Sequence, residues 1–325
     1  MKSTLSILVA ASALAMLAAC GGGGGDDSPT SKSVAITSAN QTAVARASLS
    51  GGTAVALAQG SLGAGGTSGT LAVHTLARRV IAAVTNQRKA VASAGVHATT
   101  TNTTTDTCQV SGSITVTLDD RDGSGTLSNG DVITASFAQC KDSDTSSING
   151  AIAITLTATP TDSAFDASAN FQNVAVVSGS LSSSVSGVVA LHEVDGVTVS
   201  TSRLTVGSGG LTASVTSPSY TDSVSFESGM TFATSATADT ISESLDGSFT
   251  ASSIGGRVTV STQSPLTSSL DSDYPSAGVV KIVGASGSTV LATVLDATQV
   301  QLQLDANGDG TYESTTDVPW ATLMP

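Results

Sequence analysis

Residues 151–159 have the sequence AIAITLTAT, in which apolar and polar side chains alternate. The same alternation recurs along the chain, for example in SITVTL (113–118), GRVTVST (256–262) and VQLQLD (300–305). A period of two residues with many β-branched side chains is typical of strands that bury one face. Gly, Asp, Asn and Pro interrupt this pattern, so residues 106–325 are predicted to form a mainly β domain of about 13 strands.

The connections between these predicted strands are too short for helical crossovers, so the pairing should be antiparallel. The absence of a fixed repeat argues against a solenoid or a propeller. The strand order favours an up-and-down meander curved into a half-barrel or barrel, and a two-sheet β-sandwich is the alternative. A transmembrane barrel needs aromatic girdles, for which one Trp, three Tyr and six Phe are too few.

The first third of the chain differs from the rest in charge and in composition. Residues 1–107 hold seven basic and three acidic side chains, whereas residues 108–325 hold five basic and 22 acidic ones. Residues 70–95 place Val80 and other small apolar residues on one helical face and Arg79 and other polar residues on the opposite face. This amphipathic helix has no Trp or Phe, which favours packing on the sheet over contact with a membrane.

The overall composition narrows the function. A net charge of −13 over 325 residues does not suit a protein that neutralises nucleic-acid phosphates. The three histidines, His74, His97 and His192, share no zinc-ligand spacing, and no GxSxG motif is present. We therefore expect a protein that is not an enzyme and does not bind nucleic acid.

The chain begins with MKSTLSILVAASALAMLAAC. Lys2 and the apolar stretch after it form a secretory signal, which is too short to span a bilayer as a helix. Leu17-Ala18-Ala19-Cys20 resembles the lipobox of bacterial lipoproteins. In that family the signal peptide, here residues 1–19, is removed, and the cysteine, here Cys20, carries acyl chains such as palmitate. The resemblance implies a lipid anchor in a membrane.

The residue after Cys20 is Gly21. In lipoproteins of enteric bacteria an Asp at this position retains the protein on the inner membrane, so the resemblance implies an outer-membrane location. Both the periplasmic and the external face of that membrane are compatible with the anchor. Residues 20–69 are rich in Gly, Ser and Ala and are predicted to be a tether.

Cys108 and Cys140 form an even pair in an oxidising compartment, so we expect a disulfide. The numbering of the apolar residues in the two strands opposes this pairing. The apolar residues of the first strand, such as Ile114, are even-numbered, and those of the second, such as Ile133, are odd-numbered. Pairing these faces directly would place the cysteines on opposite sides, so we predict a β-bulge or an early strand end, best accommodated at Gly112.

The stretch DRDGSGTLSNGD, residues 120–131, resembles the calcium loop of EF-hand proteins. The resemblance assigns ligand positions 1, 3, 5, 7 and 12 to Asp120, Asp122, Ser124, the carbonyl of Thr126 and Asp131. Position 12 is Asp instead of Glu, and strands flank the loop where an EF-hand has helices. The resemblance is therefore to the loop alone and implies weak binding of Ca²⁺.

A second stretch, DANGDGTYEST, begins at Asp305. Asp305, Asn307 and Asp309 hold positions 1, 3 and 5 of the same pattern. Position 12 is a threonine, so the closing carboxylate would have to come from Glu313 or Asp317. For both stretches the alternative is an Asp/Gly-rich turn between strands, because Asp and Asn tolerate left-handed conformations.

These observations together predict a non-enzymatic outer-membrane lipoprotein with a structural or envelope-binding role, stabilised by a disulfide and by calcium as a structural ion. The alternative is a carrier or receptor for an apolar ligand. A half-barrel with a helix over its mouth looks like the lipoprotein carriers and receptors of the outer-membrane sorting pathway. That likeness is one of architecture and rests on no sequence motif.

Overall fold

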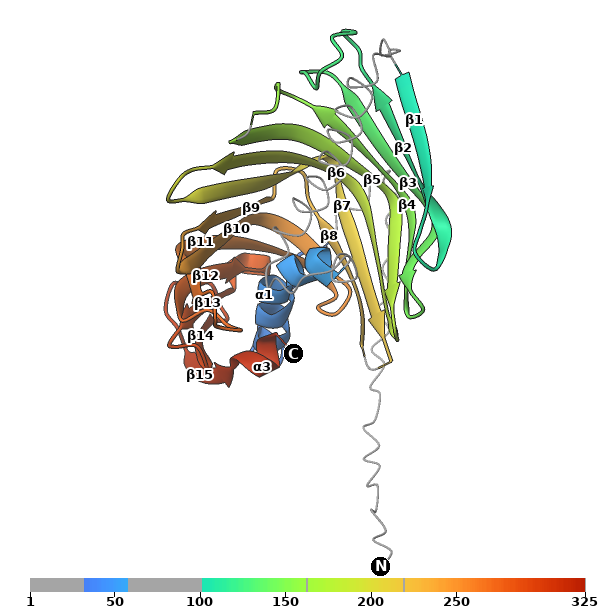
Figure 1. The fold of residues 1–325 in the computed structure, drawn as a ribbon. Coiled ribbons are helices and arrows are strands. Elements are labelled where there is room, and N and C mark those ends of the chain that lie inside the picture. The colour runs from blue at the N-terminus through green and yellow to red at the C-terminus, as the bar shows by residue number, and fades with distance from the viewer. Residues whose placement is uncertain (1–31, 58–100, 162, 219, 325) are drawn as a thin grey trace, which may run out of the picture. The chain divides into compact units, whose positions relative to one another are not determined.

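The computed structural model describes residues 32–57, 101–161, 163–218 and 220–324 (Figure 1). The predicted signal peptide, Cys20 and the helix expected at 70–95 lie outside these residues. Within the described residues, no helix is long and apolar enough to cross a membrane.

The described chain is mainly β, and its fifteen strands form one antiparallel sheet, as the alternation predicts. The two-sheet sandwich is therefore not the architecture. The strands are β1 (Thr101–Thr107), β2 (Ser111–Asp119), β3 (Val132–Ser143), β4 (Ser146–Leu156), β5 (Ala164–Ser178), β6 (Leu181–Asp195), β7 (Ser200–Ser217), β8 (Tyr220–Phe226), β9 (Thr231–Ala236), β10 (Thr240–Ala251), β11 (Gly256–Ser269), β12 (Ala277–Val283), β13 (Thr289–Val294), β14 (Gln299–Asp305) and β15 (Ser314–Pro319).

Neighbours in sequence are neighbours in the sheet, which makes it a meander with β1 and β15 at its two ends (Figure 1). The one departure is between β7 and β10. There β8 pairs with the second half of β7, and β9 pairs with the first half. Both also pair with β10, so β8 and β9 are two parts of one interrupted strand.

One face of the sheet carries the hydrophobic core. The cross-strand register places buried side chains directly opposite one another from β4 to β10. This row consists of Leu156, Ala167, Leu191, Leu204, Phe232 and Leu245. The residues that alternate with this row face the opposite side, which is why a period of two in the sequence predicts the buried face.

A line of bulges and glycines crosses the sheet and bends its strands. At Gly187 the backbone φ is 130°, and an added Cβ would lie 2.4 Å from the carbonyl oxygen of Gly210. Only glycine fits such a close approach of two strands. The same situation recurs at these facing pairs: Gly112 with Gln139, Gly150 with Asn173, Gly210 with Phe226, and Gly247 with Met230.

The first of these bulges aligns the cysteines. Ser111 pairs with Lys141 and Ser113 pairs with Ala138, so two residues of β3 oppose Gly112 alone. Cys108 and Cys140 form a disulfide with their Cα atoms 5.4 Å apart. The predicted irregularity at Gly112 is confirmed, and the extra residue belongs to β3.

Residues expected to be tether form helix α1 (Gln41–Leu57). Its residues Val44, Ala45 and Leu49 are buried, and the helix contacts the short C-terminal helix α3 (Trp320–Leu323) and several strands (Figure 1). The tether prediction was wrong for residues 41–57, because mostly small residues with one charged side chain, Arg46, give no clear amphipathic pattern. Packing, not intrinsic propensity, stabilises such a helix.

The segment before α1 is fixed to the sheet. A single parallel bridge joins Ser33 to Arg257. The backbone N–H of Val34 donates to the carbonyl of Arg257, and Ala285 donates to the carbonyl of Val34. The chain therefore enters the body between β11 and the turn that follows β12.

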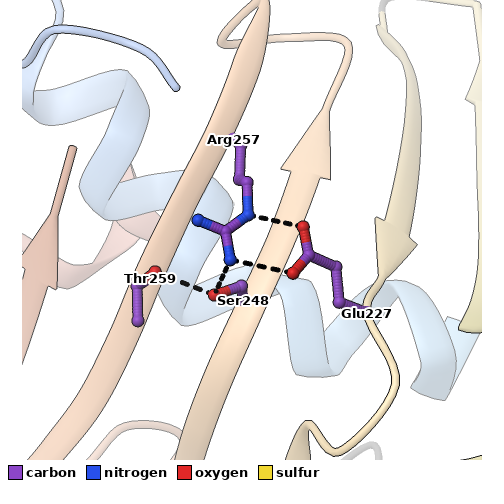
Figure 2. Close-up of polar contacts among 4 residues, drawn as sticks. All are labelled: Glu227, Ser248, Arg257 and Thr259. Atoms are coloured by element: carbon purple, nitrogen blue, oxygen red, sulfur yellow. Dashed lines mark hydrogen bonds and ion pairs between the residues drawn. The ribbon is translucent and has the colours of Figure 1, made fainter. Parts of the chain in front are cut away.

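Arg257 also braces the interruption between β8 and β9, as Figure 2 shows. Its guanidinium donates to both carboxylate oxygens of Glu227, with Nη2 2.9 Å from Oε2. Nη2 donates in addition to Ser248 of β10, 2.8 Å away. The pair lowers the pKa of Glu227. This clamp joins three neighbouring segments where the ladder between strands is broken.

Candidate functional sites

The first acidic loop lies between β2 and β3 and brings three predicted ligands together. One oxygen from each of Asp120, Asp122 and Asp131 lies within 4.8 Å of the others. Asp120 and Asp131 are buried, with exposed fractions of 2% and 0%, and Asp122 is exposed. Hard cations such as Ca²⁺ bind carboxylate oxygens grouped in this manner.

Backbone N–H groups hold the two buried carboxylates in place. Gly125 donates to Oδ2 of Asp120 at 2.9 Å. Arg121 and Ser128 donate to the two oxygens of Asp131, at 3.0 and 2.8 Å. Hydrogen bonds of this kind set the orientation of a carboxylate before any ligand arrives.

Asp122 completes the group from the exposed side. The backbone N–H of Ser124 and then the hydroxyl of Ser128 donate to its carboxylate, and they lower the pKa of Asp122 to about 2. This carboxylate is therefore ionised at any physiological pH. It contributes a fixed negative charge beside the two buried aspartates.

The other two predicted ligands of this loop bond to each other. The hydroxyl of Ser124 donates to the carbonyl oxygen of Thr126 at 3.0 Å. A cation at the loop would replace that bond if both oxygens served as ligands. The three carboxylates could bind a cation without breaking this bond, so they are the pre-organised part of the site.

The second acidic loop lies between β14 and β15. Asp305, Asp309 and Glu313 each place one oxygen within 4.8 Å of the others. Glu313 is thus the carboxylate that stands in for position 12. Asp317 is engaged elsewhere, because its carboxylate accepts a bond from Gln301 on the neighbouring strand.

The two loops share one hydrogen-bond pattern although they are far apart in the chain. In each, the Asp at position 1 accepts from the N–H of the glycine at position 6, at 2.9 Å: Asp120 from Gly125 and Asp305 from Gly310. In each, the side chain at position 3 accepts from the N–H at position 5, at 2.9 Å for Asp122 and 2.8 Å for Asn307. The loops are therefore built alike, as their common spacing predicts.

A further group of polar residues was not predicted from the sequence. His192 and Asp166 lie opposite each other on β6 and β5, with His192 Nδ1 2.6 Å from Asp166 Oδ1. They line a groove of about 710 Å³ with Arg203 and several hydroxyl-bearing residues. The two residues are far apart in sequence, so only the strand register could have revealed them.

No protein family, no curated protein and no solved structure matches this chain.

Proposed function

We propose that this protein is a non-enzymatic lipoprotein of the outer membrane, anchored by acyl chains on Cys20, with a calcium-stabilised β body. Its role is structural or concerns binding within the envelope. The lipobox Leu17-Ala18-Ala19-Cys20 supports the anchor. The disulfide between Cys108 and Cys140 fits a body that matures in an oxidising compartment.

The single observation that carries the calcium proposal is the shared construction of the two acidic loops. Each gathers three carboxylates, and each orients them with backbone N–H groups before a cation is present. Three negative charges so close together repel one another, and a divalent cation removes that repulsion. Binding in the sub-millimolar to millimolar range of extracellular modules is expected, because one carboxylate per loop is shorter or displaced from its usual position.

The location of the loops suggests what calcium would do. The first loop joins β2 to β3, and the second joins β14 to β15. These strands lie near the two ends of the strand order. A cation at each loop would hold the two strands beside it together, which is a structural function.

The anchor is tested by growing cells with a labelled fatty acid. The wild-type protein should incorporate the label, and Cys20→Ala should lose it. A Cys108→Ser/Cys140→Ser variant is the matched control and should keep the label, because its lipobox is intact. Labelling that persists in Cys20→Ala would remove the basis for the lipoprotein proposal.

The calcium sites are tested by scanning calorimetry of the purified protein. Calcium at several millimolar should raise the melting temperature, and the same concentration of magnesium should raise it less, since Mg²⁺ dehydrates reluctantly. Asp122→Asn and Asp309→Asn should each remove part of the gain, and the double variant should remove most of it. An unchanged melting temperature at these concentrations would show that both loops are only turns.

A further inference from the structure

The groove on the sheet is formed by a cross-strand row of five residues. Asp166, His192, Arg203, Ala233 and Ser244 come from β5, β6, β7, β9 and β10, and they stand directly opposite one another in the strand register. All five line the groove. They alternate with the buried row that contains Leu191 and Leu204, so they belong to the face turned away from that core row.

A second row of hydroxyl groups runs beside the first. Thr201, Ser235 and Ser242 are cross-strand neighbours on β7, β9 and β10, and they also line the groove. Pro265 of β11 lines it as well, at a stretch where the register of β11 is irregular. Most of the lining residues thus carry a hydroxyl or an ionisable group, and the groove volume of about 710 Å³ is within the usual range for small-molecule sites.

Arg203 is the distinctive residue of this groove. Its side chain is exposed and makes no hydrogen bond or ion pair with the residues that the structure describes. By contrast, Arg121 is paired with Asp119, and Arg257 is paired with Glu227. In a chain with a net charge of −13, an arginine without a carboxylate partner keeps its planar fork of donors available for an oxyanion.

The acidic residue of the groove restricts which oxyanion fits. Asp166 lies beside His192, with Oδ1 2.6 Å from His192 Nδ1. Its carboxylate opposes a doubly charged phosphate more strongly than a singly charged carboxylate. It accepts hydrogen bonds from ligand hydroxyls, and the serine and threonine hydroxyls of the groove can both donate and accept.

We propose that this groove binds a saccharide that carries a carboxylate, of the uronic-acid class. Arg203 pairs with the sugar carboxylate. The His192–Asp166 pair and the hydroxyls of Thr201, Ser235 and Ser244 bond to the sugar hydroxyls. The site depends on neither the anchor nor the acidic loops and goes beyond the function proposed above.

The proposal is tested by isothermal titration of the purified full-length protein with galacturonate and its trimer. Saturable binding is expected, with neutral galactose and its trimer at least tenfold weaker. Arg203→Gln should weaken uronate binding about tenfold or more, because it removes the charge that meets the carboxylate. His192→Ala should weaken it less. Arg121→Gln, an exposed arginine outside the groove, is the matched control and should bind as the wild type does.

Two results would overturn the proposal. The first is the absence of saturable uronate binding, or equal binding by Arg203→Gln when its melting temperature matches that of the wild type. The second comes from a parallel titration with inorganic phosphate. Tighter binding of phosphate than of uronate would show that the groove binds oxyanions without recognising the sugar.

Discussion

Cys108 and Cys140 lie with their Cα atoms 5.4 Å apart, beside the point where β3 carries one residue more than β2. A shift of one residue moves the side chains of a strand to the other face of the sheet, so the extra residue of β3 sets the side to which Cys140 points. The bulge at Gly112 and the disulfide therefore depend on one geometry. The disulfide closes the end of the β2–β3 hairpin that is remote from the acidic loop.

Removing the disulfide should destabilise the body without changing its fold. In the chain-entropy treatment, a bridge across this hairpin contributes roughly 3–4 kcal/mol. Cys108→Ser/Cys140→Ser should lower the free energy of unfolding by about this amount in urea titrations. Wild-type protein treated with a reductant is the control and should match the double variant. Equal stability of oxidised and reduced protein would contradict this expectation.

The line of glycines gives a second prediction, about the curvature of the sheet. Gly187→Ala places a Cβ 2.4 Å from the carbonyl oxygen of Gly210, at a φ of 130°. The strands must separate, and we expect a loss of about 1–3 kcal/mol or more in the free energy of unfolding. Gly209→Ala is the matched control, because φ there is 98° but no atom lies within 4 Å of the added Cβ. Gly209→Ala should lose less unfolding free energy than Gly187→Ala. An equal loss in the two variants would mean that backbone strain, and not the close approach of the strands, causes the destabilisation.

The lowered pKa of Asp122 predicts how the stability of the protein changes at acidic pH. Its folded pKa of about 2 lies below the ordinary 3.8. The carboxylate therefore contributes stability that is fully present above pH 3.8 and is lost as the pH falls through about 2. In calcium-free buffer, wild-type protein should lose more stability than Asp122→Asn between these pH values. The measurement is the urea midpoint at each pH.

Other carboxylates also have lowered pKa values, among them Glu227, Asp296 and Asp309. Asp122→Asn should therefore keep part of the pH dependence, and the difference between the two proteins is the quantity that tests the prediction. Asp144→Asn, at the exposed turn between β3 and β4, is the control and should follow the wild type. Identical pH profiles for wild type and Asp122→Asn would contradict the role of the bonds from Ser124 and Ser128.

The sequence predicts those parts of this fold in which one face of a strand is buried. The alternation of residues 151–159 identifies β4, and the mismatch between Ile114 and Ile133 predicts the bulge at Gly112. The loops were found from their spacing, because the ligand positions of such a loop are local in sequence. The sequence does not show that Glu313 is the carboxylate that closes the second loop. Its position depends on how the chain turns after Asp309.

The missed elements have a common physical cause. β1 is Thr-rich and exposed on both faces, so it shows no alternation. It is held by pairing with β2, including contacts between Thr103 and Thr117. Asp166 and His192 become neighbours only through the register of β5 with β6. Features that depend on pairing between distant segments leave no local signal in one sequence.

Trp320 connects the C-terminus to the rest of the body. Its ring stacks on that of Tyr274, with centroids 6.0 Å apart and the planes 1° from parallel. Its indole N–H donates to the carbonyl oxygens of Pro275, at 3.0 Å, and Asp296, at 3.2 Å. The residue is buried at the start of α3, which contacts α1.

Substitutions at Trp320 should separate these contributions. Trp320→Phe keeps a ring but leaves two carbonyls without a donor, so it should cost about 1–3 kcal/mol of unfolding free energy. Trp320→Ala also leaves a cavity and should cost about 3–5 kcal/mol. Tyr274→Leu removes the stacking and the 3.5 Å bond from the Tyr274 hydroxyl to the carbonyl of Met324; the stacking part should cost about 0.5–1.5 kcal/mol.

The location of the damage is measured by amide hydrogen exchange. Because α3 packs on α1 and Arg46 donates to the carbonyl of Thr322 at 2.8 Å, Trp320→Ala should speed exchange in α1 well before it does so in β2 and β3. Uniform acceleration in all three segments would show that Trp320 stabilises the whole sheet. In that case the link between the C-terminus and α1 would have no separate effect.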